Sequence, residues 1–344
     1  MKNLLKIISI VLITTIFSCS KDETAPIPQS PVVANPITTV YVGGSQKING
    51  LEKATIWKNG TPELLATETA NASRVNSVYV VGTDVYAVGF EVIANVNKAT
   101  LWKNGGKTTL SQVVSEAFSV AVRFNVAYIV GKSENKATLW TGEPALFGLT
   151  ELNNTIPSVA KSIFLTDNGT LVNGIYIAGT SASTAWTFIN NNIDVNFTNL
   201  SVAESIFARG NDVFVAVNNV FIGLKAAVLF KNGIAQNTIL SNTAVLSVYG
   251  DDQNIYAAGA INPFSGSSRA AIWENYISKP LSTKYSQANS VFVANKIVYV
   301  AGYEYDLITD FYNATLWVNG VVQTLSSNDC NVKSVFVKIG RAHV

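Results

Sequence analysis

One phrase of eight residues recurs along this chain and constrains its fold more than any other feature. It reads KATIWKNG at residues 53–60 and KATLWKNG at 98–105, and altered copies follow as KATLWTG and NATLWVNG. The copies are aligned on a tryptophan, or on a phenylalanine in one of them, with spacings of 45, 38, 46, 44, 43 and 44 residues: Trp57, Trp102, Trp140, Trp186, Phe230, Trp273 and Trp317. A period near 43 residues is the length of one four-stranded blade of a β-propeller.

Each repeat contains four strand signals. A Ser-Val/Ile-aromatic segment such as NSVYV at 76–80 comes first, and a segment such as DVYAVG at 84–89 follows. The third signal is KATLW, and the fourth is short, as in TTLS at 108–111. Alternating β-branched and aromatic residues bounded by Gly and Asn are typical of strands, and Asn-Gly after the third suits a tight hairpin turn. The sequence therefore predicts an all-β propeller.

The incomplete repeats at the two ends predict the number of blades. The second-strand segment TTVYVGG at 38–44 has no first strand before it, and the first-strand segment KSVFV at 333–337 has no successor. If these two pair, the ring closes with seven blades and avoids the unpaired strand edge of an open last blade. Eight blades remain an alternative if the natural chain continues further.

Both termini differ in character from the repeats. A basic start and a mostly apolar run at 7–17, too short to span a bilayer, predict a signal peptide over residues 1–18. The sequence IFSC resembles the lipobox of bacterial lipoproteins, and the SKDE after it resembles the export signal of Bacteroidetes-type surface lipoproteins. The resemblance implies that Cys19 is lipidated and holds the protein on the outer membrane, facing the cell surface. A plain signal peptide with an incidental cysteine is the alternative.

The flanks of the repeats define the expected domains. Residues 19–39 are rich in proline and small polar residues and predict an extended tether. The final IGRAHV at 339–344 fits no repeat and matches the translation of a common sequencing adapter, so we exclude it as non-native. Residues 40–338 remain as the propeller.

Composition excludes several classes of function. Three of the 24 basic residues lie in the excluded ends, which leaves 21 against 22 acidic residues and no basic stripe for nucleic acid. The only histidine, His343, lies in the adapter-like tail, and a lipidated Cys19 would leave Cys330 as the one free cysteine. Zinc sites and serine- or cysteine-dependent hydrolysis lack their usual imidazole. We therefore predict no catalytic residue, no metal and no cofactor.

The segment KATLWKNGGKTTL, with SEAFSVAVRFNVAYIVGKSENKATLW after it, resembles the HAF-type repeats of bacterial extracellular proteins. The resemblance covers residues 40–338 and implies an exported repeat protein without a general activity. The family's repeat histidine is replaced here by Lys53, Lys98, Lys136 and Asn313.

Two residue types recur at one position in each repeat, which is how core residues of repeat proteins behave. We interpret the tryptophans as packing between blades and not as sugar-stacking platforms. A serine also recurs seven times: Ser77, Ser119, Ser162, Ser205, Ser247, Ser290 and Ser334. Seven nucleophiles without a base make no chemical sense, so we expect these hydroxyls to satisfy backbone groups near the ring's centre.

The connections between second and third strands are long and differ between repeats, and they predict a binding face of variable loops. The loop from residue 302 is the richest in aromatic and acidic residues. The candidate ligand-binding residues are Tyr303, Tyr305, Asp306, Asp310, Phe311 and Tyr312, with Phe264 and Phe221 from other loops of the same face. Aromatics beside acceptors suit a sugar or a peptide, and an ordinary loop that packs its own aromatics is the alternative.

Three functions are compatible with these features. The first is a non-enzymatic surface lipoprotein that binds a glycan or a protein through the loop face. The second is a glycan-degrading enzyme that uses two carboxylates. The third is a scaffold component of an envelope complex, which would carry an extended apolar patch. Asp251 and Asp252 are expected to form a turn.

Overall fold

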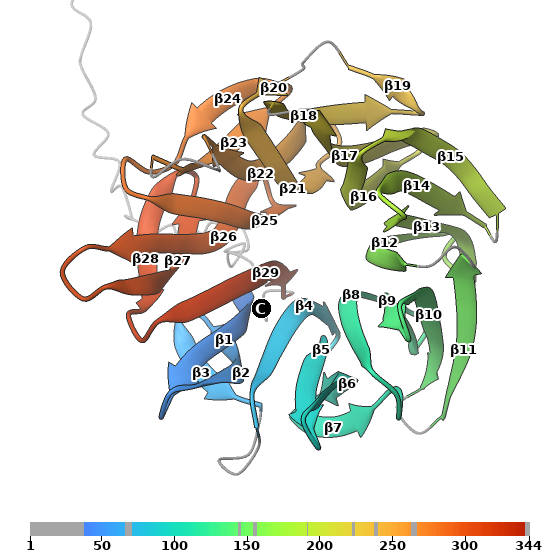
Figure 1. Ribbon diagram of the computed structural model, residues 1–344, viewed down its shortest axis with the longest axis horizontal. Helices are drawn as coiled ribbons and strands as arrows, with labels where there is room; N and C mark the ends of the chain where they lie inside the picture. The colour runs from blue at the N-terminus through green and yellow to red at the C-terminus, as the bar shows by residue number, and fades with distance from the viewer. Residues whose placement is uncertain are drawn as a thin grey trace, which may run out of the picture. The chain divides into compact units, whose positions relative to one another are not determined.

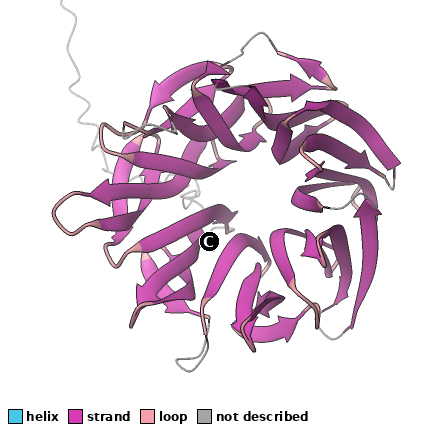
Figure 2. Ribbon diagram, viewed as in Figure 1, coloured by secondary structure: helices cyan, strands magenta, loops and turns pink. Residues whose placement is uncertain are grey.

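The computed structural model describes residues 38–65, 71–143, 146–153, 157–190, 192–221, 224–236, 240–262 and 267–340. These residues form seven antiparallel sheets arranged as blades around a central channel, and none of them is helical (Figure 1, Figure 2). The predicted seven-bladed β-propeller is confirmed. Because the ring is closed, the eight-blade alternative does not hold for this chain.

Every blade follows the same strand order from the channel outwards. The innermost strands, for blades 1 to 7, are β29 (Cys330–Ile339), β4 (Ser73–Val81), β8 (Ser115–Arg123), β12 (Ser158–Asp167), β16 (Ser201–Arg209), β21 (Thr243–Gly250) and β25 (Ser286–Ala294). The second strands are β1 (Thr38–Ile48), β5 (Asp84–Ile93), β9 (Val126–Ser133), β13 (Val172–Ser181), β17 (Asp212–Phe221), β22 (Ile255–Ile261) and β26 (Ile297–Asp306).

The two outer positions complete each blade. The third strands are β2 (Leu51–Lys58), β6 (Val96–Lys103), β10 (Lys136–Glu143), β14 (Thr184–Ile189), β18 (Leu224–Lys231), β23 (Arg269–Glu274) and β27 (Phe311–Val318). The outermost are β3 (Thr61–Leu64), β7 (Gly106–Thr109), β11 (Leu146–Asn153), β15 (Asn192–Asn199), β19 (Ile234–Ala235) with β20 (Leu240–Ser241), β24 (Ile277–Pro280) and β28 (Val321–Ser326).

Blade 1 is built from both ends of the repeat region. Strand β29 pairs with β1 over nine residue pairs, from Thr38 opposite Ile339 to Gln46 opposite Cys330. The pairing of KSVFV with TTVYVGG that the sequence predicts is therefore confirmed. It gives β1 a partner on each side, so blade 1 is complete and the ring is closed.

The Asn-Gly turns explain part of the repeated phrase. In the KNG turn of blade 2, Asn104 has a positive φ of 50°, and its Oδ1 accepts a 2.8 Å hydrogen bond from the backbone N–H of Val85. Asn59, Asn232 and Asn319 make the same bond in their blades. Asparagine suits this position because it tolerates the left-handed conformation and carries an acceptor for the start of the second strand.

The repeated tryptophans pack between blades. Trp102 of blade 2 lies in one buried cluster with Tyr41 and Ile56 of blade 1, and Trp140 of blade 3 lies in another with Tyr86 and Leu101 of blade 2. All six tryptophan side chains are at most 2% exposed, while Phe230 at the seventh position is partly buried. Their interpretation as core residues is confirmed, because none presents a face to a ligand.

Each innermost strand carries a β-bulge directly before its repeated serine. The residues that the strand pairing skips are Asn76, Phe118, Lys161, Glu204, Leu246, Asn289 and Lys333. A bulge bends the strand and presents its extra residue away from the regular ladder. The glycine of the second strand accommodates it in most blades: a Cβ on Gly302 would collide with the carbonyl oxygen of Gln287.

Candidate functional site

The two faces of the disc carry different kinds of turn. Turns between first and second strands, and between third and fourth, lie on one face, because the strands alternate in direction. Turns between second and third strands lie on the other, which we call the hairpin face. The innermost strands also begin on the hairpin face, so the bulged residues lie toward that end of the channel.

Three of the four long variable connections expected on this face, those from residues 89, 218 and 302, consist mostly of paired strand, and for these three the prediction of loops is wrong. The fourth, between β22 and β23, lies partly outside the described residues. Strands β5 and β6 are joined by Ala94 and Asn95 alone, both with positive φ, and β26 and β27 by residues 307–310. Pairing between β17 and β18 continues to Phe221 opposite Leu224. Continued pairing satisfies backbone groups that an irregular loop would leave to water.

The structure brings three of the predicted aromatic residues together. Tyr303 and Tyr305 lie on β26 and Tyr312 on β27, with ring centroids 5.0 Å apart for Tyr303–Tyr312 and 5.2 Å for Tyr305–Tyr312. Tyr285 joins this cluster, 6.1 Å from Tyr305. The hydroxyl of Tyr305 donates to the carboxylate of Asp310, which occupies the turn.

The remaining predicted residues are not part of this cluster. Asp306 and Phe311 are paired with each other in the position next to the Tyr305–Tyr312 pair, so their side chains point to the other side of the hairpin. Phe221 lies on β17 in blade 5, but its side chain is outside the described part of the molecule. Phe264 and Cys19 also lie outside the described residues.

A cavity of about 320 Å³ lies beside the tyrosines, between blades 7 and 1, and we call it the tyrosine pocket. Its lining residues are Lys47, Glu52, Tyr303, Tyr312, Asp329, Cys330 and Asn331. Lys47 Nζ forms a 3.1 Å ion pair with Asp329 Oδ2. Burial raises the pKa of Tyr303 and of Tyr312 above the usual value of a phenol. The pocket thus combines aromatic walls with hydroxyl, ammonium and carboxylate groups.

A chain of hydrogen bonds leads from this pocket to the channel. The hydroxyl of Tyr303 donates to Gln287 Oε1 at 3.1 Å, and Gln287 Nε2 donates to Asn289 Oδ1 at 2.8 Å. Asn289 Nδ2 in turn donates to the carbonyl of Val332 at 2.6 Å. Side chains of the pocket and of the bulged positions are thereby held in one network.

The channel opens on the hairpin face as a second cavity of about 340 Å³, which we call the channel mouth. It is lined by all seven bulged residues together with Arg74 and Gln287. Lys161 pairs with Glu204 at 2.7 Å, and Arg74 pairs with Glu116 at 3.3 Å. The channel mouth was not among the sites predicted from the sequence. Its signal was present, since the residue before the repeated serine changes from repeat to repeat while the serine does not.

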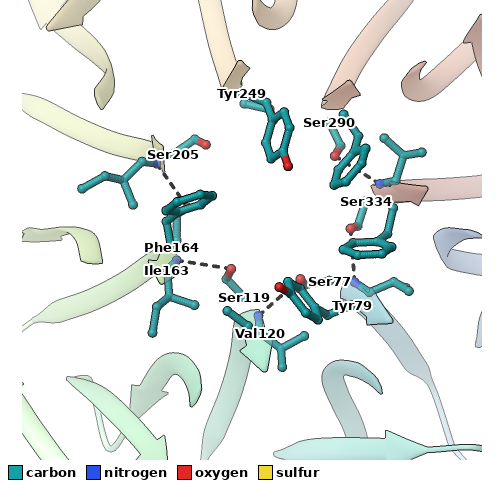
Figure 3. A pocket seen from close by; sticks show the side chains of 18 of the residues that line it. Ser77, Tyr79, Ser119, Val120, Ile163, Phe164, Ser205, Tyr249, Ser290 and Ser334 are labelled. Carbon is teal, nitrogen blue, oxygen red and sulfur yellow. Dashed lines mark hydrogen bonds between the residues drawn. The ribbon is translucent and has the colours of Figure 1, made fainter. Parts of the chain in front are cut away.

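The repeated serines form a ring deeper in the channel (Figure 3). Each serine Oγ accepts a hydrogen bond of 3.1–3.3 Å from a backbone N–H of the next blade, as between Ser77 and Val120. The seven bonds close the circle through Ser334, which accepts from Val78. The prediction that these serines satisfy backbone groups is confirmed.

Beyond the serines, aromatic rings surround a cavity of about 360 Å³ (Figure 3). Neighbouring rings have centroids 4.6–5.0 Å apart in the order Phe164, Phe207, Tyr249, Phe292, Phe336 and Tyr79. Blade 3 has Ala121 at this position, and its Arg123 instead donates to the Tyr79 hydroxyl and to Asp167. Burial raises the pKa of Tyr249 to about 12. We interpret this ring of aromatic side chains as packing that holds the innermost strands together.

Asp251, one of the two carboxylates of the GDDQN segment, takes part in a structural turn. Asp251 accepts hydrogen bonds from the N–H groups of Gln253 and Asn254, so the predicted turn is confirmed. In the described part of the chain no cluster of His, Cys, Asp and Glu could hold a metal ion. No helix among these residues is long and apolar enough to cross a membrane.

Comparisons with known proteins identify the fold and nothing finer. No family model and no curated protein matches the sequence. A putative 6-phosphogluconolactonase from Bacteroides uniformis is 13% identical with a TM-score of 0.52, over 88% of this chain and 99% of that one. A structure from the nidogen/laminin complex is 9% identical with a TM-score of 0.42, over 89% and 100% of the two chains. At such identities, similarity extends to the propeller architecture alone.

Proposed function

We propose that this protein is a non-enzymatic surface lipoprotein that binds a glycan in the tyrosine pocket. One observation carries the proposal: Tyr303 and Tyr312 stand at 81° to each other in a cavity that also presents the Lys47–Asp329 ion pair. Aromatic walls contact the C–H faces of a sugar ring, and a few fixed polar groups orient its hydroxyls.

The carboxylates of the hairpin favour binding over hydrolysis. A glycoside hydrolase needs a carboxylic acid whose pKa is raised. Here the backbone N–H of Ile308 lowers the pKa of Asp306, and Asp310 accepts the Tyr305 hydroxyl. Glu304 is buried, bound to Ser282 and paired with Lys284 at 3.1 Å.

Affinity electrophoresis through gels that contain different polysaccharides tests the proposal. We expect at least one gel to retard the protein, and Tyr312→Ala to lower that affinity roughly tenfold or more, as loss of a central aromatic contact does. Phe311→Ala is the matched control, because Phe311 is 42% exposed and Tyr312 38%, yet they point to opposite sides of the hairpin. Equal losses in both variants, or no retardation in any gel, would contradict the proposal.

A protein ligand is the second candidate, and the tip of the same hairpin favours it. Leu307 and Ile308 are 88% and 95% exposed, next to the acidic residues Asp306 and Asp310. An exposed apolar pair of this kind suits the pocket of a partner. Cross-linking in whole cells, with a Leu307→Ser, Ile308→Ser variant as control, distinguishes this candidate: only a partner held at the tip is lost in the variant.

The proposed lipid anchor rests on the sequence around Cys19. We expect Cys19→Ser to move the protein from the detergent phase to the aqueous phase in a phase-partition assay, because the thiol that would carry the lipid is removed. Partition that does not change would exclude lipidation at this residue.

A further inference from the structure

We infer that the channel mouth binds the carboxylate of an acidic saccharide, with Lys333 as its counter-ion. The inference rests on the proposed glycan-binding function and adds two points: the ligand is negatively charged, and Lys333 recognises that charge.

The charges of the mouth leave one cation without a partner. Lys161 Nζ lies 2.7 Å from Glu204, and Arg74 lies 3.3 Å from Glu116 and 3.7 Å from Glu52. Among the described residues, none forms an ion pair or a hydrogen bond with the side-chain ammonium of Lys333, although this side chain lines the same cavity. Lys333 is partly buried, and a charged group withdrawn from water without a counter-ion is costly, so such groups are normally paired.

The surroundings of Lys333 act against its charge. Burial lowers the pKa of Lys333, and the positive charge of Arg74 lowers it further, while Glu52, Glu116 and Glu204 only partly compensate. A carboxylate that enters the mouth would favour the ammonium form and relieve this cost. Lys161 and Arg74 are already held by glutamates, so Lys333 is the cation of the mouth that remains available for direct contact with an incoming carboxylate.

The geometry of the mouth suits an acidic sugar. Phe118 and Leu246 line the same cavity and offer apolar contacts for a sugar ring. Asn331 lines the tyrosine pocket and Lys333 the mouth, both on β29, and two residues along a strand span about 7 Å. One oligosaccharide can therefore place one unit between the tyrosines and a uronate unit at Lys333.

The test compares ligands that differ only in charge. Polygalacturonate, alginate and hyaluronate, each with its neutral methyl ester, serve as probes for the full-length mature protein. We expect tighter binding of at least one acidic polymer than of its ester, by roughly ten- to a hundredfold, the usual effect of a hydrogen bond to a charged group. That preference should weaken as pH rises through the lowered pKa of Lys333, whereas binding of the ester should not change.

Two variants make the role of Lys333 specific. Lys333→Asn introduces the residue that blades 2 and 7 carry at the equivalent position, Asn76 and Asn289, and should bind acid and ester alike. Lys338→Asn removes the same charge near the other end of β29 and should bind like the wild type. A preference for acid that survives Lys333→Asn, or equal binding of acid and ester by the wild type, would overturn the inference while glycan binding stands.

A second measurement separates this inference from the proposed function. If no polymer binds, the proposed function fails, and lysine-selective ¹³C NMR with sodium glucuronate then tests the anion site alone. A rise in the pKa of Lys333 on addition of glucuronate would support a carboxylate site. An unchanged Lys333 signal would overturn it.

Discussion

Two adjacent positions on each innermost strand behave in opposite ways. The serine is identical in all seven blades, whereas the bulged residue before it is Asn, Phe, Lys, Glu, Leu, Asn or Lys. The serine hydroxyl must meet a backbone N–H of the next blade, so the ring requires the same group seven times. The bulged residue meets no such requirement and points into the mouth. Repeated positions therefore build the scaffold, and unrepeated ones give the channel its individual chemistry.

The largest expected effect comes from breaking a repeated core position. Trp140→Ala should lower the free energy of unfolding by about 3–5 kcal/mol, because it leaves a cavity between blades 2 and 3. Phe118→Ala, at an unrepeated position of the same blade, should cost far less, since its ring is partly exposed in the mouth. Urea unfolding of both variants measures the difference. Similar losses would contradict the distinction between the two classes of position.

A second experiment sharpens the comparison at adjacent positions in the channel. Ser162→Ala leaves the backbone N–H of Ile206 without its acceptor and should cost about 1–3 kcal/mol. Leu246→Asn copies the bulged residue of blades 2 and 7 and should change stability by no more than about 0.5 kcal/mol. Chemical denaturation of the two variants provides the measurement. If Leu246→Asn lowered the free energy of unfolding as much as Ser162→Ala, both positions would be needed for the stability of the scaffold.

The smallest expected effect has the opposite sign. Lys333→Leu should raise the melting temperature at neutral pH by roughly 1–3 °C, because it removes a partly buried ammonium that has no direct partner. The folded state has the lower pKa, so between this pKa and that of an ordinary lysine it binds fewer protons than the unfolded state. Wild-type stability should therefore rise with pH across that window, and the advantage of the variant should shrink. Thermal melts of the wild type and the variant from pH 7 to alkaline pH measure both trends. A variant that melts below the wild type at neutral pH would contradict the interpretation that the ammonium of Lys333 has no partner.

The sequence predicted the scaffold better than the site, for a physical reason. Blade number, closure by residues 333–337, burial of the tryptophans and the role of the serines all follow from positions that repeat. The tyrosine hairpin was found by composition but taken for a loop, because no Asn-Gly marks its turn. The pairing that places Tyr305 opposite Tyr312 also separates both from Asp306 and Phe311.

The channel mouth was missed because its geometry depends on bulges. Regular alternation directs successive side chains to the two faces of a blade, so Lys333 and the six equivalent residues would not be expected to point into the channel. The bulge before each serine changes that relation, and simple strand periodicity does not reveal it. A comparison of the repeats with one another, position by position, would have singled out the residue that varies beside a constant serine.

The closure of blade 1 also determines how the protein would be presented. Thr38, at the start of β1, is paired with Ile339 at the end of β29, and both lie on the face opposite the hairpin face. The described chain therefore begins on the face opposite the tyrosine pocket and the channel mouth. An attachment through Cys19, as proposed above, would enter the propeller at Thr38, on the face away from both openings.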